Sequence, residues 1–145
     1  MGSSIDAYVE YDTTLVYEPG AGETPPFSKV PEAMDLTHFL PFREGKDYPF
    51  FGAISGIRNA TSLPPLYPLR GLPSPLSAEA AGTLETIYDP CSLGWLTLRE
   101  IEAALTHMGL RREDLSLETN LVLYIMRYLE KQLGQDRVRL VFGIE

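Results

Sequence analysis

The placement of proline constrains this chain more than any other feature of its sequence. All 12 prolines lie between Pro19 and Pro90. Because proline fixes φ and removes a backbone hydrogen-bond donor, it interrupts helix interiors and sheet ladders. We therefore expect regular structure near both ends of the chain and long irregular segments between them.

Periodic patterns of apolar residues predict where the regular elements lie. Residues 5–11 alternate between apolar and polar side chains, which is typical of a strand, and residues 138–142 do the same near the end of the chain. Residues 15–17 could form a hairpin partner of the first strand. Apolar residues at three- and four-residue spacing, together with capping residues, predict helices over 47–58, 77–87, 97–109 and 116–133.

These elements indicate an α+β fold in one domain, 1–145. We expect a small antiparallel or mixed sheet that includes the N-terminal and C-terminal strands, with three to four helices packed on it. Residues 1–4 are expected to be disordered or tag-like, 18–46 and 60–76 to form long proline-rich loops, and 116–145 to form the C-terminal helix and strand.

Composition excludes several classes of protein. A single cysteine cannot form an internal disulfide or a thiolate zinc site, which favours a reducing, cytoplasmic setting. The sequence contains no apolar run of the ~20 residues needed to span a bilayer. With a net charge of −8, the chain is a poor candidate for sequence-specific nucleic-acid binding, and a basic protein surface is a more natural partner. Few amide side chains and many prolines are consistent with a thermophilic source.

No common catalytic motif is present, and we predict no catalytic residue, metal site or cofactor. Two loop segments nevertheless contain candidate binding residues. Arg58 and Asn59, and then Arg70, each end an apolar or proline-rich stretch, where rigid neighbours position a loop residue. The planar guanidinium of arginine can bind a carboxylate or phosphate, but it can equally tie a loop to its own carbonyl groups.

Asp6, Glu10 and Cys91 complete the candidate set. Asp6 and Glu10 share the polar face of the first strand; they are either a pair of carboxylates near a pocket or, as we favour, part of a solvated strand face. Cys91 is either a small buried residue or a nucleophile. Trp95 is assigned to the core. The last helix has a wide apolar stripe, and we expect the contact surface for a partner to combine acidic residues with the proline-rich segment and this helix. The stripe consists of Leu117, Leu121, Tyr124, Ile125, Tyr128 and Leu129.

Five segments follow one another along the chain: IDAYVE from Ile5, Arg58-Asn59, LRGLP from Leu69, WLTLREI from Trp95 and VRLVF from Val138. In this order they resemble a family of small phage and bacterial proteins of largely uncharacterised activity. In that family the first strand tends to contain Asp-Ile-His, and the stretch before the tryptophan tends to contain His-Ser-x-Ser. This chain has Ser4-Ile5-Asp6 and Cys91-Ser92-Leu93-Gly94 there, so both histidines are replaced, which argues against an enzyme.

The size, acidity and composition also resemble a family of early proteins from phages of thermophilic bacteria that bind the host RNA polymerase. This resemblance implies a phage protein that contacts the flap region of the β subunit, with the σ factor nearby, and inhibits or redirects host transcription in the host cytoplasm. The alternative is a nucleotide-binding, counter-defence or hydrolytic protein whose pocket gathers Asp6, Arg58, Arg70 and Cys91. The oligomeric state does not follow from the sequence.

Overall fold

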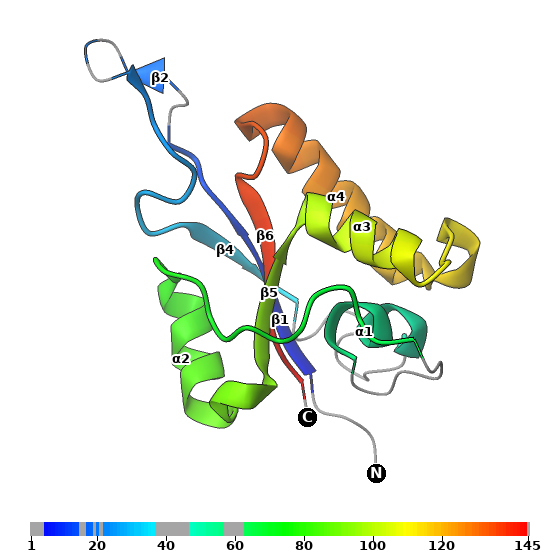
Figure 1. The fold of residues 1–145 in the computed structure, drawn as a ribbon. Coiled ribbons are helices and arrows are strands. Elements are labelled where there is room, and N and C mark those ends of the chain that lie inside the picture. The colour runs from blue at the N-terminus through cyan, green and yellow to red at the C-terminus, as the bar shows by residue number, and fades with distance from the viewer. Residues whose placement is uncertain are drawn as a thin grey trace.

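The computed structural model describes residues 5–14, 17–18, 20, 22–36, 47–56 and 63–144. Its centre is a four-stranded antiparallel sheet in the order β4-β1-β6-β5, with two helical layers around it (Figure 1). The strands are β1 (Ile5–Tyr11), β4 (Glu32–Asp35), β5 (Leu93–Thr97) and β6 (Val138–Ile144), and the helices are α1 (Tyr48–Ser55), α2 (Ala78–Ile87), α3 (Leu98–His107) and α4 (Leu117–Leu133).

The two terminal strands form the middle of the sheet. β1 and β6 are paired along their whole length, from Ile5 opposite Ile144 to Tyr11 opposite Val138. Both strands place small or branched apolar residues at alternate positions, which suits a pleated surface buried on at least one face. The predicted α+β fold with both terminal strands in one sheet is therefore confirmed, and all its pairings are antiparallel.

The four predicted helices are present, and side-chain caps explain where they begin. Asp47, Ser77 and Ser116 each accept a hydrogen bond from a backbone N–H in the first turn of α1, α2 and α4. Thr97 forms the predicted capping box with Glu100 at the start of α3. Gly109, in the left-handed region at φ 71°, follows the end of that helix.

Four short strands depart from the sequence interpretation. The loop predicted over 18–46 contains β4, and it contributes to a hairpin in which β2 (Tyr17–Glu18) pairs with β3 (Gly22–Glu23) rather than with β1. Residues 93–97, expected only to precede a helix, form β5 at one edge of the sheet. The predicted loop 60–76 is free of helix and strand over its described part, 63–76, and residues 1–4 lie outside the described residues.

The two faces of the sheet are covered unequally. On one face α1, α3 and α4 enclose the larger apolar core, which includes Val9, Phe50, Ile101, Met126 and Leu140. On the other face α2 covers only part of the sheet, around a smaller cluster made of Tyr8, Ala80, Leu84, Tyr88, Leu93 and Val141. We call these the three-helix face and the α2 face.

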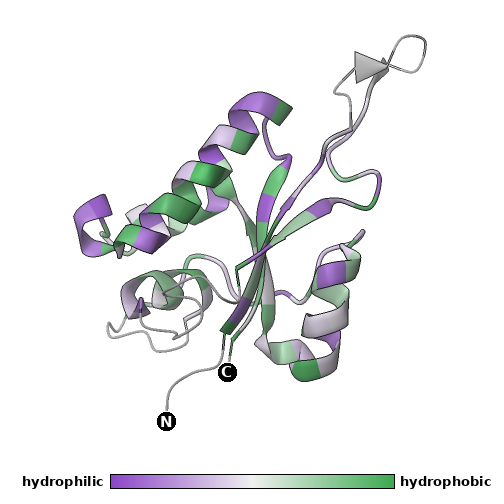
Figure 2. Cartoon of the chain, turned by 180° about the vertical axis from the view of Figure 1, so that it is seen from behind, coloured by the Kyte–Doolittle hydropathy of each residue, from purple (hydrophilic) through white to green (hydrophobic). Residues whose placement is uncertain are grey.

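The α2 face contains charged residues, and they are buried. Hydrophilic segments occur within the strands themselves (Figure 2). The expectation of a solvated face on the first strand is therefore wrong: Glu10 is fully buried. It is buried because the α2 layer and its preceding segment cover this face, and because an arginine on β6 neutralises the carboxylate.

Candidate functional site

Two buried ion pairs join β1 to β6 on the α2 face. Arg139 donates from Nε to Oε1 of Glu10 at 2.9 Å, and the two residues are direct cross-strand neighbours. Oε2 of Glu10 accepts the backbone N–H of Ser77 at 2.9 Å, so the same carboxylate fixes the start of α2. Burial lowers the pKa of Arg139, while the hydrogen bond and charge of Glu10 oppose that shift.

The second pair stands at the end of the sheet. Arg137 donates to Oδ2 of Asp12 at 2.8 Å, and both side chains are almost fully buried. Burial by itself would raise the pKa of Asp12, but hydrogen bonds from Thr14 and Phe27 and the charge of Arg137 outweigh it and lower the pKa. The carboxylate thereby holds the backbone of Phe27, whose N–H it accepts at 2.8 Å.

Guanidinium groups and aromatic rings stack next to these pairs. The guanidinium carbon of Arg139 lies 3.8 Å from the centre of the Phe27 ring and 5.8 Å from that of Trp95. Arg70 lies 3.9 Å from the Trp95 ring and donates two hydrogen bonds to the carboxylate of Glu100, at 2.9 and 2.5 Å. Burial by itself would raise the pKa of Glu100. Hydrogen bonds from Arg70 and Thr97 outweigh this effect, so the pKa of Glu100 is lowered.

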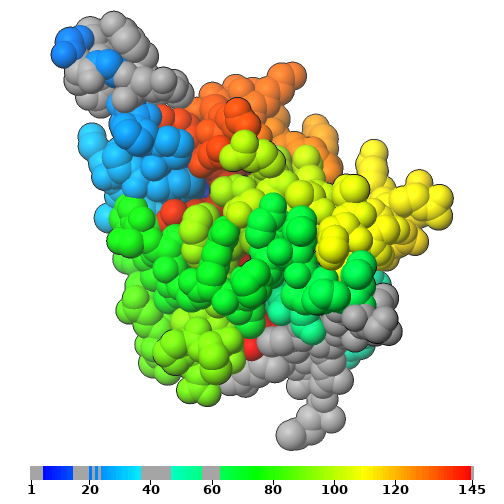
Figure 3. Space-filling view, viewed as in Figure 1, coloured from blue at the N-terminus to red at the C-terminus, as the bar shows by residue number. Residues whose placement is uncertain are grey.

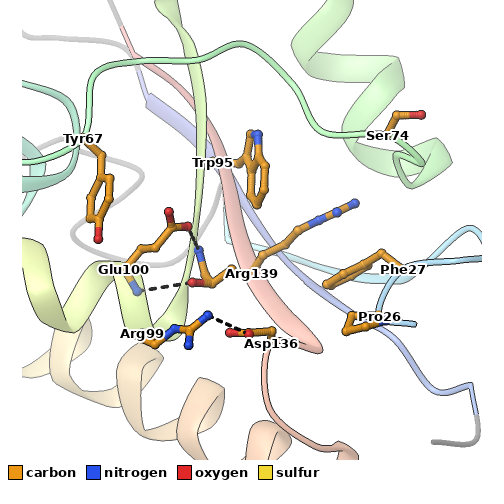
Figure 4. Close-up of a pocket in the computed structure, with 10 residues that line it drawn as sticks. Pro26, Phe27, Tyr67, Ser74, Trp95, Arg99, Glu100, Asp136 and Arg139 are labelled. Carbon is orange, nitrogen blue, oxygen red and sulfur yellow. Dashed lines mark hydrogen bonds and ion pairs between the residues drawn. The ribbon is translucent and has the colours of Figure 1, made fainter. Parts of the chain in front are cut away.

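A pocket of about 610 Å³ opens beside this stack, which we call the Trp95 pocket. Figure 4 shows the guanidinium end of Arg139 between Trp95 and Phe27, with the Arg99–Asp136 ion pair on the other side of the site. In Figure 3, red atoms of the C-terminal region are visible between light-blue, green and yellow-green segments of the chain. The lining residues are Pro26, Phe27, Tyr67, Ser74, Trp95, Thr97, Arg99, Glu100, Asp136 and Arg139.

A second candidate site is the outer side of α4. Leu117, Leu121, Tyr124 and Tyr128 are between 46% and 80% exposed, and their spacing places them on one face of the helix. We call these four residues the α4 stripe. They are four of the six residues of the apolar stripe noted in the sequence. The buried residues of α4 include Thr119, Val122, Leu123 and Met126, on the opposite side. The helix is therefore apolar on two sides, and only one of them packs against the rest of the protein.

Of the predicted site residues, Asp6 has a structural partner. Its Oδ2 accepts the hydroxyl hydrogen of Tyr88 at 2.7 Å. The Tyr88 ring lies so close to Gly143 that a Cβ at Gly143 would be 2.6 Å from it. Glycine at this position thus allows the ring to lie against β6 and reach the carboxylate of Asp6 on β1.

The other predicted residues are not drawn into one described site. Arg70 is engaged by Glu100 and Trp95, and Cys91 is exposed on a short 3-10 turn, Pro90–Ser92. Arg58 and Asn59 lie outside the described residues. Asp6, Arg70 and Cys91 are not among the lining residues of the Trp95 pocket.

Arg139, which lines the pocket, left a faint signal in the sequence. It has the same parity as Val141 on β6, and Glu10 lies directly opposite it on β1. Opposite charges on two strands predicted to share a sheet could have indicated a buried pair. Phe27 gave no signal, because only the fold brings it from a proline-rich segment to β6.

Neither a metal centre nor a membrane span is found in the described part of the chain. Within it, no group of three or more His, Cys, Asp and Glu side chains could hold a metal ion. No helix of the described residues is both long and apolar enough to cross a bilayer. Comparisons of the chain with protein-family models, curated proteins and solved structures return no match.

Proposed function

We propose that this protein acts by binding another protein through the α4 stripe, without catalysing a reaction. The observation that carries the proposal is the exposure of four large apolar side chains along one face of a 17-residue helix. Soluble monomers rarely expose contiguous apolar surface of this kind, and where they do it commonly marks an interaction site. Leucine and tyrosine at i, i+4, i+7 and i+11 are the anchors with which a helix enters an apolar groove.

The charge of the whole chain and the charge of α4 differ, and each affects a different step of binding. The whole chain has a net charge of −8, whereas α4 contains two acidic residues, Glu118 and Glu130, and two basic ones, Arg127 and Lys131. The overall field attracts a basic partner over a distance, which raises the association rate. The neutral helix then contributes apolar contact, which determines how long the complex lasts.

The partner we propose is the RNA polymerase of the host bacterium, contacted at the flap region of the β subunit near the σ factor. This choice rests on the resemblance to early phage proteins described above, and the consequence would be inhibition or redirection of host transcription. The exposed stripe supports protein binding in general. The experiment therefore separates the partner from the surface.

The test is capture of purified RNA polymerase holoenzyme from a thermophilic bacterium on the immobilised protein, at low and at moderate salt. We expect capture by the unmodified chain. The double variant Leu121→Arg/Tyr124→Arg should weaken it at least about tenfold, because two apolar anchors become charged at the centre of the contact.

A matched control is available on α2. Ile87 is 56% exposed, and Ile87→Arg places an arginine, with one added charge against the two of the double variant, on an apolar surface residue outside the α4 stripe. It should leave capture unchanged. No capture by the unmodified chain overturns the polymerase as partner, and undiminished capture by the double variant overturns the stripe as the surface. Sedimentation that shows a dimer, converted to monomer by the double variant, assigns the stripe to a second copy of this chain instead.

A further inference from the structure

The Trp95 pocket has features that the proposed protein-binding role does not require. The most informative is Arg139, whose side chain is 3% exposed yet lines the pocket. Its Nε donates to Glu10 and its Nη2 to the carbonyl of Pro75. Nη1 makes no hydrogen bond within the described part of the chain, and it is not among the fully buried polar atoms there that lack a partner. It is therefore accessible from the pocket, where a ligand oxygen can accept its hydrogen bond.

The backbone at Phe27 is strained, and this conformation places the Phe27 ring against Arg139 at the edge of the Trp95 pocket. Phe27 has φ 58° in the left-handed region, where a bulky residue is an outlier. The carboxylate of Asp12 accepts its N–H, and its ring covers one face of Arg139. Backbone strain of this kind is retained chiefly at sites where it positions a functional group.

A second arginine, Arg99, also lines the Trp95 pocket. Arg99 is 65% exposed and donates from Nη2 to Oδ2 of Asp136 at 2.8 Å. This single bond leaves other N–H groups of the guanidinium able to reach a ligand. Arginine forks of this type bind phosphate and carboxylate groups strongly, because the donor geometry matches the anion.

We propose that the Trp95 pocket binds a nucleoside monophosphate, or a planar heteroaromatic ligand of the same chemistry that carries one anionic group. The anion accepts from Nη1 of Arg139 and from Arg99. The planar ring packs against the surface of Tyr67, Trp95 and Phe27 that Arg70 and Arg139 leave open to the pocket. Stacking of a base on aromatic side chains tolerates any base, which fits a pocket with several rings. Its volume of about 610 Å³ is in the range of small-molecule sites.

The charge of the protein favours a small ligand over a nucleic-acid polymer. A chain with net charge −8 repels an extended polyanion, whereas a mononucleotide meets only the charges that line the pocket, which are those of Arg99, Arg139, Glu100 and Asp136. The pocket and the α4 stripe share no residue. Protein binding by the α4 stripe and ligand binding by the Trp95 pocket can therefore be tested independently.

Trp95 provides the assay, because it is the only tryptophan in the chain and it lines the pocket. Its fluorescence is measured during titration with AMP, GMP, CMP and UMP, with correction for nucleotide absorbance, and the rise in melting temperature is measured in parallel. We expect saturable quenching and a raised melting temperature with at least one nucleotide. Inorganic phosphate and the matching nucleoside should each bind at least about tenfold more weakly, because each lacks half of the contacts.

Arg99→Ala is the test variant, because its exposed side chain can be removed without opening the core. It should weaken nucleotide binding about tenfold or more. The matched control is Arg111→Ala, which removes another exposed arginine from a carboxylate pair outside the pocket and should leave the affinity unchanged. The proposal is overturned by no saturable signal with any of the four nucleotides, by phosphate binding as tightly as the nucleotide, or by Arg99→Ala retaining full affinity.

Discussion

The two faces of the sheet bury different kinds of side chain. On the three-helix face the buried side chains are nearly all apolar, and three helices supply the cover. On the α2 face one helix covers a smaller cluster, and Glu10, Asp12, Arg137 and Arg139 are buried as ion pairs. The first face gains its stability from removing apolar area from water, and the second depends on each charge keeping its partner.

This difference also locates the candidate pocket. Apolar layers pack without gaps because side chains interdigitate, whereas the α2 face leaves a rim where loops rather than a helix meet β5 and β6. Loop residues and the arginine of β6 gather at that rim. The face with less helical cover is therefore the face with an accessible polar site.

The largest expected effect comes from removing one partner of a buried ion pair. Glu10→Leu should lower the free energy of unfolding by about 3–5 kcal/mol, because Arg139 is left as a buried charge without a counter-ion. The N–H of Ser77 also loses its acceptor. Urea unfolding followed by circular dichroism measures the change.

The double variant Glu10→Leu/Arg139→Met is the control for that experiment. Replacing both charges with apolar side chains removes the uncompensated charge, so the double variant should regain more than half of the lost stability. A single variant that loses less than about 1 kcal/mol would show that the α2 face does not depend on this pair.

On the three-helix face, removing a core side chain should lower the free energy of unfolding because it leaves a cavity and no unpaired charge. Leu123 is 1% exposed and packs in the larger core, so Leu123→Ala should cost about 2–5 kcal/mol. Leu117, on the same helix, is 80% exposed, and Leu117→Ala should change stability by about 0.5 kcal/mol or less. Equal losses at the two positions, measured by the same unfolding assay, would contradict the placement of α4 with its stripe outward.

Much of this fold follows from local patterns, and the candidate sites do not. Strand alternation at Ile5–Tyr11 and the capping box at Thr97 are short-range signals, and the structure has both elements where the sequence predicts them. The edge strand β4 has only four residues in a proline-rich segment, so its pairing with β1 depends on tertiary context. The burial of Glu10 depends on a partner 129 residues away, which periodicity within one strand cannot indicate.

The α4 helix illustrates a second limit. Its apolar residues were counted as one wide stripe, although a helix that contacts its protein on one side buries only part of that circumference. Val122 and Met126 face the sheet layer, whereas Leu121 and Tyr124 do not. Hydrophobic periodicity identifies the faces of a helix, but which face is buried is decided by the strands and helices packed against it.

The smallest predicted effect concerns a carboxylate near the three-helix face that, unlike Glu10, lacks a full set of partners. Glu130 Oε2 is buried and makes no hydrogen bond in the described part of the chain. Burial raises the pKa of Glu130, and the negative charges of Asp136 and Glu102 raise it further. A carboxyl group whose pKa is raised by folding contributes stability at low pH, and that contribution is lost as the pH rises through the folded-state pKa.

Glu130→Gln keeps the shape of the side chain and removes its charge. We expect the variant to be slightly more stable than the unmodified protein above that pKa, because folding then no longer opposes ionisation of a carboxyl group at this position. Below the pKa of an ordinary glutamate the two proteins should converge, because the carboxyl group is then protonated whether the chain is folded or not. Melting temperatures measured from acid to neutral pH give the difference directly. A variant that is destabilised at neutral pH and matches the unmodified protein only in acid would mean that the Glu130 charge is stabilising in the fold, as the charges of the α2 face are.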